Sequence, residues 1–99
     1  MNEPMNPKLP LRTVIRVRRL ELSLTQADVA EALRTEPEAV GNWERGVRRI
    51  DLDKLPRLAR VLQVDERQLC RQWIAEFHAG VYRSMFPDDE VSPLHALDG

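Results

Sequence analysis

The sequence predicts an all-α fold, in which a small helical domain is followed by an extended C-terminal helical segment. Arg, Leu, Ala and Glu dominate the 99 residues, and these residue types favour helices. Runs that alternate Val, Ile, Thr or Tyr with polar residues, as strands require, are absent. Several residues that favour helix N-caps directly precede segments with helical spacing of apolar positions. A chain of this length is expected to form one domain.

The first helix is predicted to run from Leu11 to about Leu22, with Ser23 marking its end. It follows residues 1–10, where three prolines and little apolar surface predict a mobile arm. Apolar side chains along this helix can anchor a core. The same helix is strongly basic, because it carries Arg12, Arg16, Arg18 and Arg19.

Two short, capped helices follow, separated by a very short corner. Thr25 is a good N-cap for the first of them, and Asp28 completes a capping-box-like pair. The second begins after Thr35 or Glu36; Pro37 favours Glu36 as the N-cap, because proline is tolerated at the first helical position. Gly46 is expected to end that second helix with a positive φ. Helices joined this tightly should cross steeply and present the front of the second one outward, a shape that fits a DNA major groove about 12 Å wide.

The remaining helices are marked by acidic residues and proline. Asp53 is the favoured N-cap of the fourth helix, because Pro56 is tolerated only near a helix start, and this helix should run to about Leu62. Asp65 with Gln68 opens the fifth helix. Gly80 is expected to break that helix and leave residues 81–86 as a short extra turn. The sequence thus divides into a domain over 11–69, a helical extension over 70–86 and a disordered tail over 87–99.

Composition excludes several classes of protein. Cys70 is the only cysteine, so an internal disulfide is impossible and a reducing, cytoplasmic interior suits the chain. Apolar runs fall short of the roughly 18 residues that cross a bilayer, so no membrane association is expected. Residues 1–60 carry 12 Lys/Arg against 9 Asp/Glu, a charge of +3, whereas residues 61–99 carry 3 against 7, a charge of −4. This asymmetry suits a basic working half and an acidic remainder.

Residues 11–69 resemble the Xre/Cro-type helix-turn-helix domain of phage and bacterial repressors. The resemblance rests on three stretches in the family's order, namely Leu24-Thr25-Gln26 with Val29-Ala30-Glu31, then Trp43-Glu44-Arg45-Gly46, then Leu52…Leu55…Leu58-Ala59…Leu62…Val64. It implies a five-helix repressor-like fold and a sequence-specific regulator of transcription that binds double-stranded DNA. It further implies a dimeric repressor that acts by occupying a promoter.

The resemblance also assigns roles to individual residues. It implies that base edges are read by Pro37, Glu38, Gly41 and Asn42. It implies that the DNA backbone is contacted by Gln26, Arg34, Arg45, Arg48 and Arg49. It implies a structural salt bridge between Arg19 and Glu44. Arg34 departs from the family, which usually has glycine there, and a positive φ at this position would cost of order 1 kcal/mol.

The chemistry of these side chains leaves some roles open. The amide of Asn42 can pair bidentately with adenine. Glu38 can accept a hydrogen bond from cytosine N4, or it can serve only to stabilise the helix start through the helix dipole. Arg45, Arg48 and Arg49 form a cationic cluster that suits phosphate contacts, although a solvated basic loop is the ordinary fate of such residues.

The extension over 70–86 is amphipathic and has two possible uses. It can fold back as extra core of one chain, or two chains can bury it against each other. We expect the second, because most soluble homo-oligomers are twofold. The predicted dimer interface consists of Trp73, Ile74, Phe77, Val81, Tyr82 and Met85.

Enzyme activity is not expected, because the sequence offers no credible nucleophile–base pair and no glycine loop that would cradle a phosphate. No metal site, cofactor or small-molecule effector is evident, since Cys70, His78 and His95 are isolated. A second hypothesis treats the chain as a protein-interaction module, or an antitoxin-like partner-binding protein, that keeps the helix-turn-helix fold. The acidic start of the third helix and the net charge of −1 favour this alternative.

Overall fold

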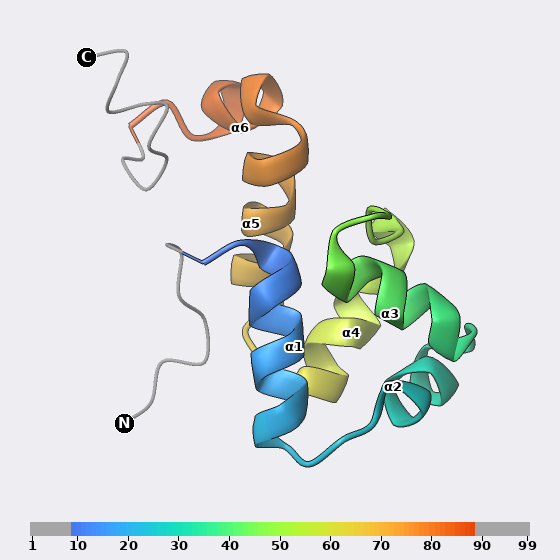
Figure 1. The fold of residues 1–99 in the computed structure, drawn as a ribbon. Helices are drawn as coiled ribbons and strands as arrows, with labels where there is room; N and C mark the ends of the chain where they lie inside the picture. Colours follow the sequence, from blue (N-terminus) through green and yellow to red (C-terminus); the bar gives the residue numbers. More distant parts are fainter. Residues whose placement is uncertain (1–8, 89–99) are drawn as a thin grey trace.

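A computed structural model of the chain describes residues 9–88, and in this range the fold contains helices and no strand, as Figure 1 shows. The predicted all-α fold is therefore confirmed. The elements are α1 (Leu11–Glu21), α2 (Gln26–Leu33), α3 (Pro37–Arg45), the 3-10 turn η1 (Leu52–Lys54), α4 (Leu55–Leu62), α5 (Glu66–Phe77) and α6 (Ala79–Met85). Among the helices described, none is long and apolar enough to span a membrane. The predicted arm and tail lie outside the described residues, apart from 9–10 and 87–88.

The ends of α2 and α3 follow the local sequence closely. Thr25 and Asp28 form a complete capping box, in which the Asp28 N–H donates to Thr25 Oγ1 at 2.9 Å and the Thr25 N–H donates to Asp28 Oδ2 at 2.8 Å. The hydrogen bond from the Thr25 backbone lowers the pKa of the Asp28 carboxyl below its usual value. Glu36 is the N-cap of α3, Pro37 is its first residue, and Gly46 ends it at φ 77°.

The corner between α2 and α3 has the backbone conformation that usually calls for glycine. Arg34 ends α2 with φ 57° and ψ 48°, in the left-handed region. A non-glycine residue there costs of order 1 kcal/mol, which the surrounding helices must offset. The Thr35 N–H donates to the Ala30 carbonyl at 2.9 Å across this corner and helps to hold it closed.

Two predicted helix boundaries are wrong. Asp53 does not cap α4; it lies inside η1, whose Lys54 N–H donates to the Asp51 carbonyl at 3.0 Å and which leads directly into α4. The backbone of that 3-10 turn takes the place of a side-chain cap. The break after α5 falls at His78 (φ −144°, ψ 63°) instead of Gly80, which lies within α6. The His78 ring packs 5.2 Å from the Trp73 ring, five residues earlier, and its Nε2 lies 3.5 Å from the Arg49 guanidinium, so a local ring contact and a tertiary contact accompany the break.

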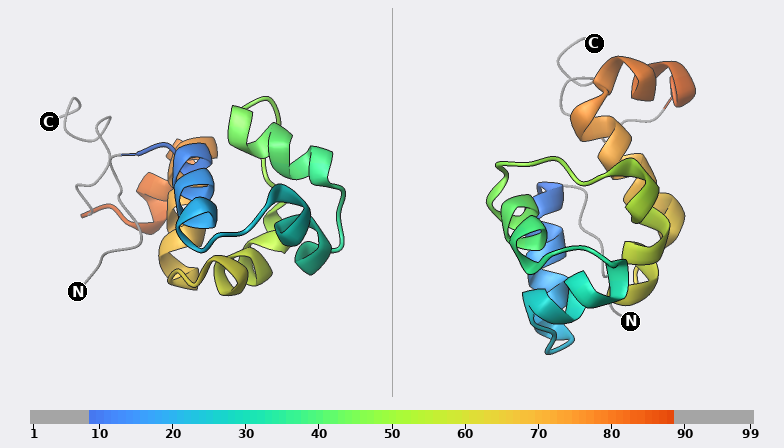
Figure 2. Two further views of the ribbon diagram at one scale, coloured as in Figure 1. Left: turned by 60° about the horizontal axis from the view of Figure 1, so that its bottom comes forward. Right: turned by 90° about the vertical axis from the view of Figure 1, so that its right-hand side faces the viewer.

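One hydrophobic core joins α1 to α5. Figure 2 shows α5 and α6 extending beyond the group formed by the other helices, and α5 packs on that group through Leu69, Trp73 and Phe77. The buried residues of this core come from every helix up to α5, and they include Ile15, Val29, Val40, Trp43, Leu55, Leu58, Leu62, Leu69 and Trp73. Helix α5 therefore continues without interruption across the boundary predicted near residue 70.

The burial of Trp73 corrects the expectation for the dimer interface. Its side chain is only 6% exposed, and its indole Nε1 donates to the Ile50 carbonyl at 3.0 Å. Tyr82 is also buried, at 3% exposed. Ile74 and Phe77 are half-buried against the core. This part of the extension folds back within one chain, which leaves Val81 and Met85 as the members of the predicted set that are largely exposed.

Polar contacts fasten α5 to the start of α1, where Pro10 offers no side-chain cap. The Leu11 N–H donates to Glu76 Oε2 at 2.5 Å, and the Gln72 amide donates to the Leu9 carbonyl at 2.6 Å. A carboxylate at this position also suits the positive end of the helix dipole. The C-terminal half of α5 thus supplies the cap that the sequence before α1 lacks.

Replacing Trp73 with alanine should destabilise the single chain by about 3–5 kcal/mol, because the substitution empties part of the core and removes the donor to Ile50. Urea unfolding followed by circular dichroism measures the loss. Ser84→Ala, at an exposed position of α6 outside the predicted dimer interface, is the control and should change the unfolding free energy by less than about 0.5 kcal/mol. A dissociated dimer with unchanged chain stability in the Trp73 variant would contradict the core position.

Candidate nucleic-acid interface

Helix α3 divides into a buried side and a side that faces away from the other helices. Val40 and Trp43 point into the core and are fully buried. On the other side Glu38 and Arg45 are exposed and Asn42 is half-buried. The polar residues are spaced by about one helical turn, so they form a strip along the outer side of the helix. The apolar residues on the opposite side anchor the helix in the core.

Asn42 and Arg45 act as a pair on that strip. An Arg45 Nη donates to Asn42 Oδ1, one helical turn away. Because the Asn42 carbonyl oxygen is engaged, the pair presents hydrogen-bond donors, namely the Asn42 amide and the rest of the guanidinium. The Asn42 oxygen has a second lone pair, so it can accept from adenine N6 while it still accepts from Arg45.

Behind the strip, a buried ion pair joins three helices. Arg19 of α1 donates to Glu44 of α3 through Nε at 2.7 Å and through Nη2 at 2.9 Å. The hydrogen bond to Glu44 raises the pKa of Arg19, so Arg19 stays charged. Gln26, the first residue of α2, donates from Nε2 to Glu44 Oε1 at 3.1 Å. The predicted pairing of Arg19 with Glu44 is present, and Glu44 also fixes Gln26.

Gly41 faces the same side as Asn42 but is itself buried. A Cβ at this position would lie 3.2 Å from the Arg45 guanidinium and 3.4 Å from Gln26 Oε1. Gly41 therefore lets the Gln26 and Arg45 side chains lie close to the helix. This burial corrects the expectation that Gly41 offers an open face for a base, because two long side chains cover it.

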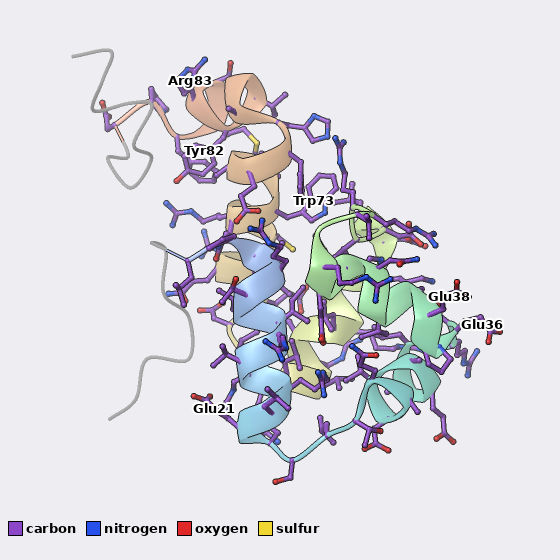
Figure 3. The ribbon with its side chains drawn as sticks, in the orientation of Figure 1. Glu21, Glu36, Glu38, Trp73, Tyr82 and Arg83 are labelled. Atoms are coloured by element: carbon purple, nitrogen blue, oxygen red, sulfur yellow. The ribbon has the colours of Figure 1, made fainter. Side chains whose placement is uncertain are left out.

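The two ends of α3 carry opposite charge. Pro37, Glu36 and Glu38 are exposed at its start, and Figure 3 shows the two glutamates at the end of the helix farthest from α6. Arg45 lies in its last turn, and exposed Arg48 and Arg49 follow in the loop to η1. The outward side of α3 thus runs from an acidic to a basic end, and the basic end is the part that suits phosphates.

The arginines beside α3 differ in how they are held. Arg34 is exposed at the corner, and Arg48 lies 3.5 Å from Asp51 in an exposed ion pair. Arg49 turns toward α5, where its guanidinium lies 5.0 Å from the centre of the Phe77 ring and 3.5 Å from His78 Nε2. Contact between a guanidinium and an aromatic face is favourable. The end of α5 therefore sets the position of one arginine in the basic loop.

A family model described as helix-turn-helix matches residues 15–69, which is more than half of the chain. The chain belongs to the Xre/Cro-type helix-turn-helix family. This family is one of DNA-binding regulators and not of enzymes. No curated protein and no solved structure matches the chain.

Several contacts of this helix-turn-helix domain were not predicted from the sequence. The pairing of Asn42 with Arg45 follows the i, i+3 spacing on one helix and was accessible to a sequence argument. Gln26 and Glu44 are 18 positions apart in the sequence, and Arg49 and Phe77 are 28 positions apart. No local sequence pattern predicts contacts over such separations. In the described range the domain also holds no group of three or more His, Cys, Asp or Glu side chains that could bind a metal ion.

Cys70 lies half-buried against the core of the helix-turn-helix domain. Burial raises the pKa of its thiol, and the nearby Glu66 adds to the effect. The thiolate, which is the reactive form, is therefore disfavoured at neutral pH. This side chain is a packing residue in the fold.

Replacing Glu44 with alanine should destabilise the domain by about 3–5 kcal/mol, because the substitution leaves the Arg19 charge buried without its partner. Thermal and urea unfolding measure the effect. The matched control is Glu21→Ala, which removes the exposed partner of Arg18 at 3.1 Å and should cost less than about 1 kcal/mol. Equal losses in the two variants would show that the Arg19–Glu44 pair contributes no more than a surface pair.

Proposed function

We propose that the chain is a sequence-specific regulator of transcription that binds double-stranded DNA as a dimer and represses by occupying a promoter. The observation that carries the proposal is the outward strip of α3, with Asn42 and Arg45 beside the basic loop at the end of that helix. A strip of this kind fits the major groove, where base edges present distinct patterns of donors and acceptors.

In this proposal the strip reads bases and the surrounding side chains fix its register. Asn42 and Glu38 approach base edges, while Pro37 starts α3 next to the groove. Gln26, Arg34, Arg45, Arg48 and Arg49 contact the sugar–phosphate backbone. Contacts to phosphate position a protein on DNA, whereas contacts to base edges specify the sequence. A regulator of this kind acts where the DNA is, so cytoplasmic localisation is part of the proposal.

Repression by occupancy is the simplest mode of action for this surface. The described residues form one helical unit, in which α3 and α6 lie far apart. Bound at a promoter, such a unit would exclude polymerase sterically. Autoregulation of its own operon is a further implication of the family resemblance.

A second candidate function is a protein-interaction module, including an antitoxin-like role. The exposed Glu36 and Glu38 at the start of α3 favour it, because carboxylates near DNA phosphates are repelled. In that case the acidic end of α3 would meet a basic surface on a protein partner. DNA binding separates the two functions directly.

Fluorescence anisotropy with a short labelled duplex of random sequence tests the proposal. We expect measurable affinity at low salt that falls steeply as salt rises, because each phosphate contact releases counterions. Arg48→Ala should reduce the slope of log affinity against log salt by about 1. Arg83→Ala, on α6 at the far end of the molecule from Glu38 (Figure 3), removes the same charge and should leave the slope unchanged. Indifference to all duplexes at low salt would favour the interaction module.

Replacing Asn42 with alanine should weaken binding to the preferred duplex by about 1–3 kcal/mol and leave the melting temperature unchanged. The duplex is selected from a random pool, and binding to a scrambled duplex is the reference. The loss arises because one base edge is left without its partner. A lowered melting temperature together with unchanged DNA binding would assign Asn42 to the fold instead of the interface.

The dimer in this proposal uses the exposed apolar side of α6. Val81 and Met85 lie one turn apart and are 52% and 54% exposed. Half-buried Ile74 and Phe77 of α5 border the same end of the molecule. Two half-sites bound by two linked copies strengthen DNA binding and set a spacing between them.

Replacing both Val81 and Met85 with lysine should convert the dimer to a monomer, because the substitution places charge on both sides of the apolar contact. Light scattering after size exclusion distinguishes one 11.5 kDa chain from two. Leu20→Lys is the control, since Leu20 is similarly exposed at 53% but lies on α1. Retention of the dimer by the double variant would exclude this face as the interface.

A further inference from the structure

Two exposed arginines of α1 are left without a charged partner by the fold. Arg12 and Arg16 lie one helical turn apart, and both are exposed. Within the described part of the chain, neither guanidinium forms a hydrogen bond or an ion pair. Arg18 and Arg19 of the same helix differ, because each of them is paired with a carboxylate. The charge of Arg12 and Arg16 is therefore available to a partner outside these residues.

Both arginines lie on the side of α1 that faces the last turn of α3. Residues 12, 16 and 19 share one face of the helix, since positions three and four residues apart are neighbours. Arg19 fixes the direction of this face, because its Nε lies 2.7 Å from Glu44 Oε2 of α3. At the start of the helix, the Arg12 Cδ lies 2.9 Å from the point where a Cβ on Gly46 would stand. Arg16 follows on the same face between these two contacts, beside the basic end of α3.

This face of α1 borders the proposed interface directly. Arg19 Nη2 and Gln26 Nε2 both donate to Glu44 Oε1, at 2.9 Å and 3.1 Å. Gln26 is one of the proposed contacts with the DNA backbone, and Arg45, another of them, follows Glu44 on α3. The exposed arginines of α1 therefore continue a row of side chains that face phosphate in the proposed complex.

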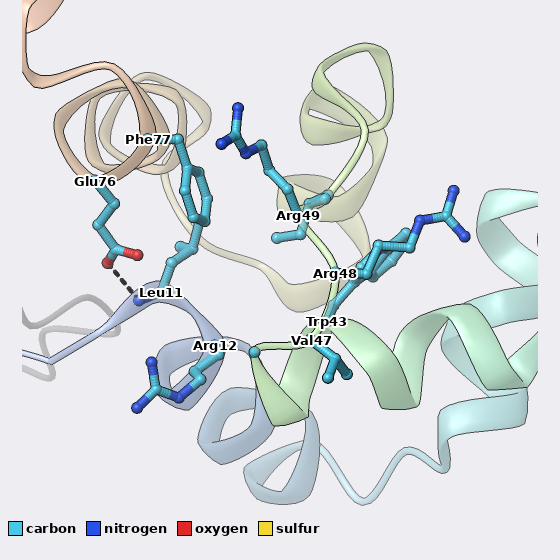
Figure 4. Close-up of a pocket in the computed structure, with 10 residues that line it drawn as sticks. Leu11, Arg12, Trp43, Val47, Arg48, Arg49, Glu76 and Phe77 are labelled. Carbon is cyan, nitrogen blue, oxygen red and sulfur yellow. Dashed lines mark hydrogen bonds between the residues drawn. The ribbon is translucent and has the colours of Figure 1, made fainter.

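The electrostatics of this part of α1 favour an anion. Arg12 is the second residue of the helix, whose first turn carries no acidic residue, and a cation there opposes the helix dipole. Arg12 and Arg16 also repel each other, because like charges one turn apart are unfavourable. Figure 4 shows the Arg12 guanidinium turned away from the pocket that Leu11 and Phe77 line. An anion beside these two side chains would offset both effects.

We propose that Arg12 and Arg16 form a second contact with the DNA backbone, on the strand at one edge of the groove that α3 enters. Packed helices lie about 8–10 Å apart between their axes, and the major groove is about 12 Å wide. With α3 in the groove, the helix packed beside it lies over the strand that borders the groove. A guanidinium matches the geometry of a phosphate, with which it can form two parallel hydrogen bonds.

The inference rests on the proposed DNA binding and extends it from α2, α3 and the basic loop to α1. Four residues of helix rise about 6 Å, whereas a DNA strand carries one phosphate per about 3.4 Å of axis. Arg12 and Arg16 would thus hold neighbouring phosphates of one strand. Such contacts add affinity and fix the orientation of α3, but they carry no base specificity.

Fluorescence anisotropy with a labelled duplex of random sequence tests the contact in an α1 variant that combines Arg12→Gln with Arg16→Gln. For each chain bound, the slope of log affinity against log salt should fall by about 2, since each lost phosphate contact lowers it by about 1. The matched control variant combines Arg67→Gln with Arg83→Gln, which removes the same charge from exposed positions of α5 and α6, and should leave the slope unchanged. Both variants should keep the wild-type melting temperature, because all four side chains are exposed.

Methylphosphonate substitution, which removes the charge of one phosphate, locates the contact on a duplex selected from a random pool. Some phosphates should matter to the wild-type chain and no longer to the α1 variant, and these are expected to be neighbours on one strand. They should differ from the phosphates that cease to matter in Arg48→Ala, because Arg48 lies in the loop after α3.

An unchanged salt slope in the α1 variant, beside normal duplex binding by the wild-type chain, would overturn this inference alone. An equal fall in the control variant would also overturn it, because the effect would then come from net charge and not from position. Absence of duplex binding by the wild-type chain would overturn the proposed function itself, and this inference with it.

Discussion

The buried ion pair between Arg19 and Glu44 is the constraint on which the rest of the structure depends. Arg19 Nε of α1 lies 2.7 Å from Glu44 Oε2 of α3, which fixes one helix against the other. The same carboxylate accepts a hydrogen bond from Gln26, the first residue of α2. Three helices are thereby set in one arrangement by a single acidic side chain that is almost completely buried. Because two charges inside a protein are tolerated only with good geometry and full hydrogen bonding, few other arrangements of these helices can keep both satisfied. The ion pair therefore sets which side of α3 faces outward.

A second constraint comes from α5, which is more than an appendage to the helix-turn-helix domain. Trp73 fills the core and bonds Ile50, while Glu76 caps the start of α1. The turn that follows α5 places His78 and Phe77 against Arg49 of the basic loop. Helix α5 and the turn after it thus contribute to stability and to the position of Arg49, and the exposed apolar side of α6 is where we propose that two copies associate.

Charge along α3 unites the proposed functions. Its acidic start is stabilised by the helix dipole, and its basic end continues into a loop of arginines. The arginines at the basic end favour phosphate, so in the proposed complex that end of α3 holds the DNA backbone while Glu38 lies toward the bases.

Local sequence determined the helices, the capping box at Thr25, the corner that ends in left-handed Arg34 and the glycine that closes α3, because caps and turn residues act through the backbone next to them. The family motifs determined the fold class and the pairing of Arg19 with Glu44. Only the tertiary structure decided that Trp73 belongs to the core, that the break falls at His78 and that side chains cover Gly41. An amphipathic helix shows which side is apolar but not what covers it, since burial against its own chain and burial against a second copy require the same residues. That choice is made by groups far away in the sequence, here Ile50 and Leu11, whose backbone finds its partners on α5.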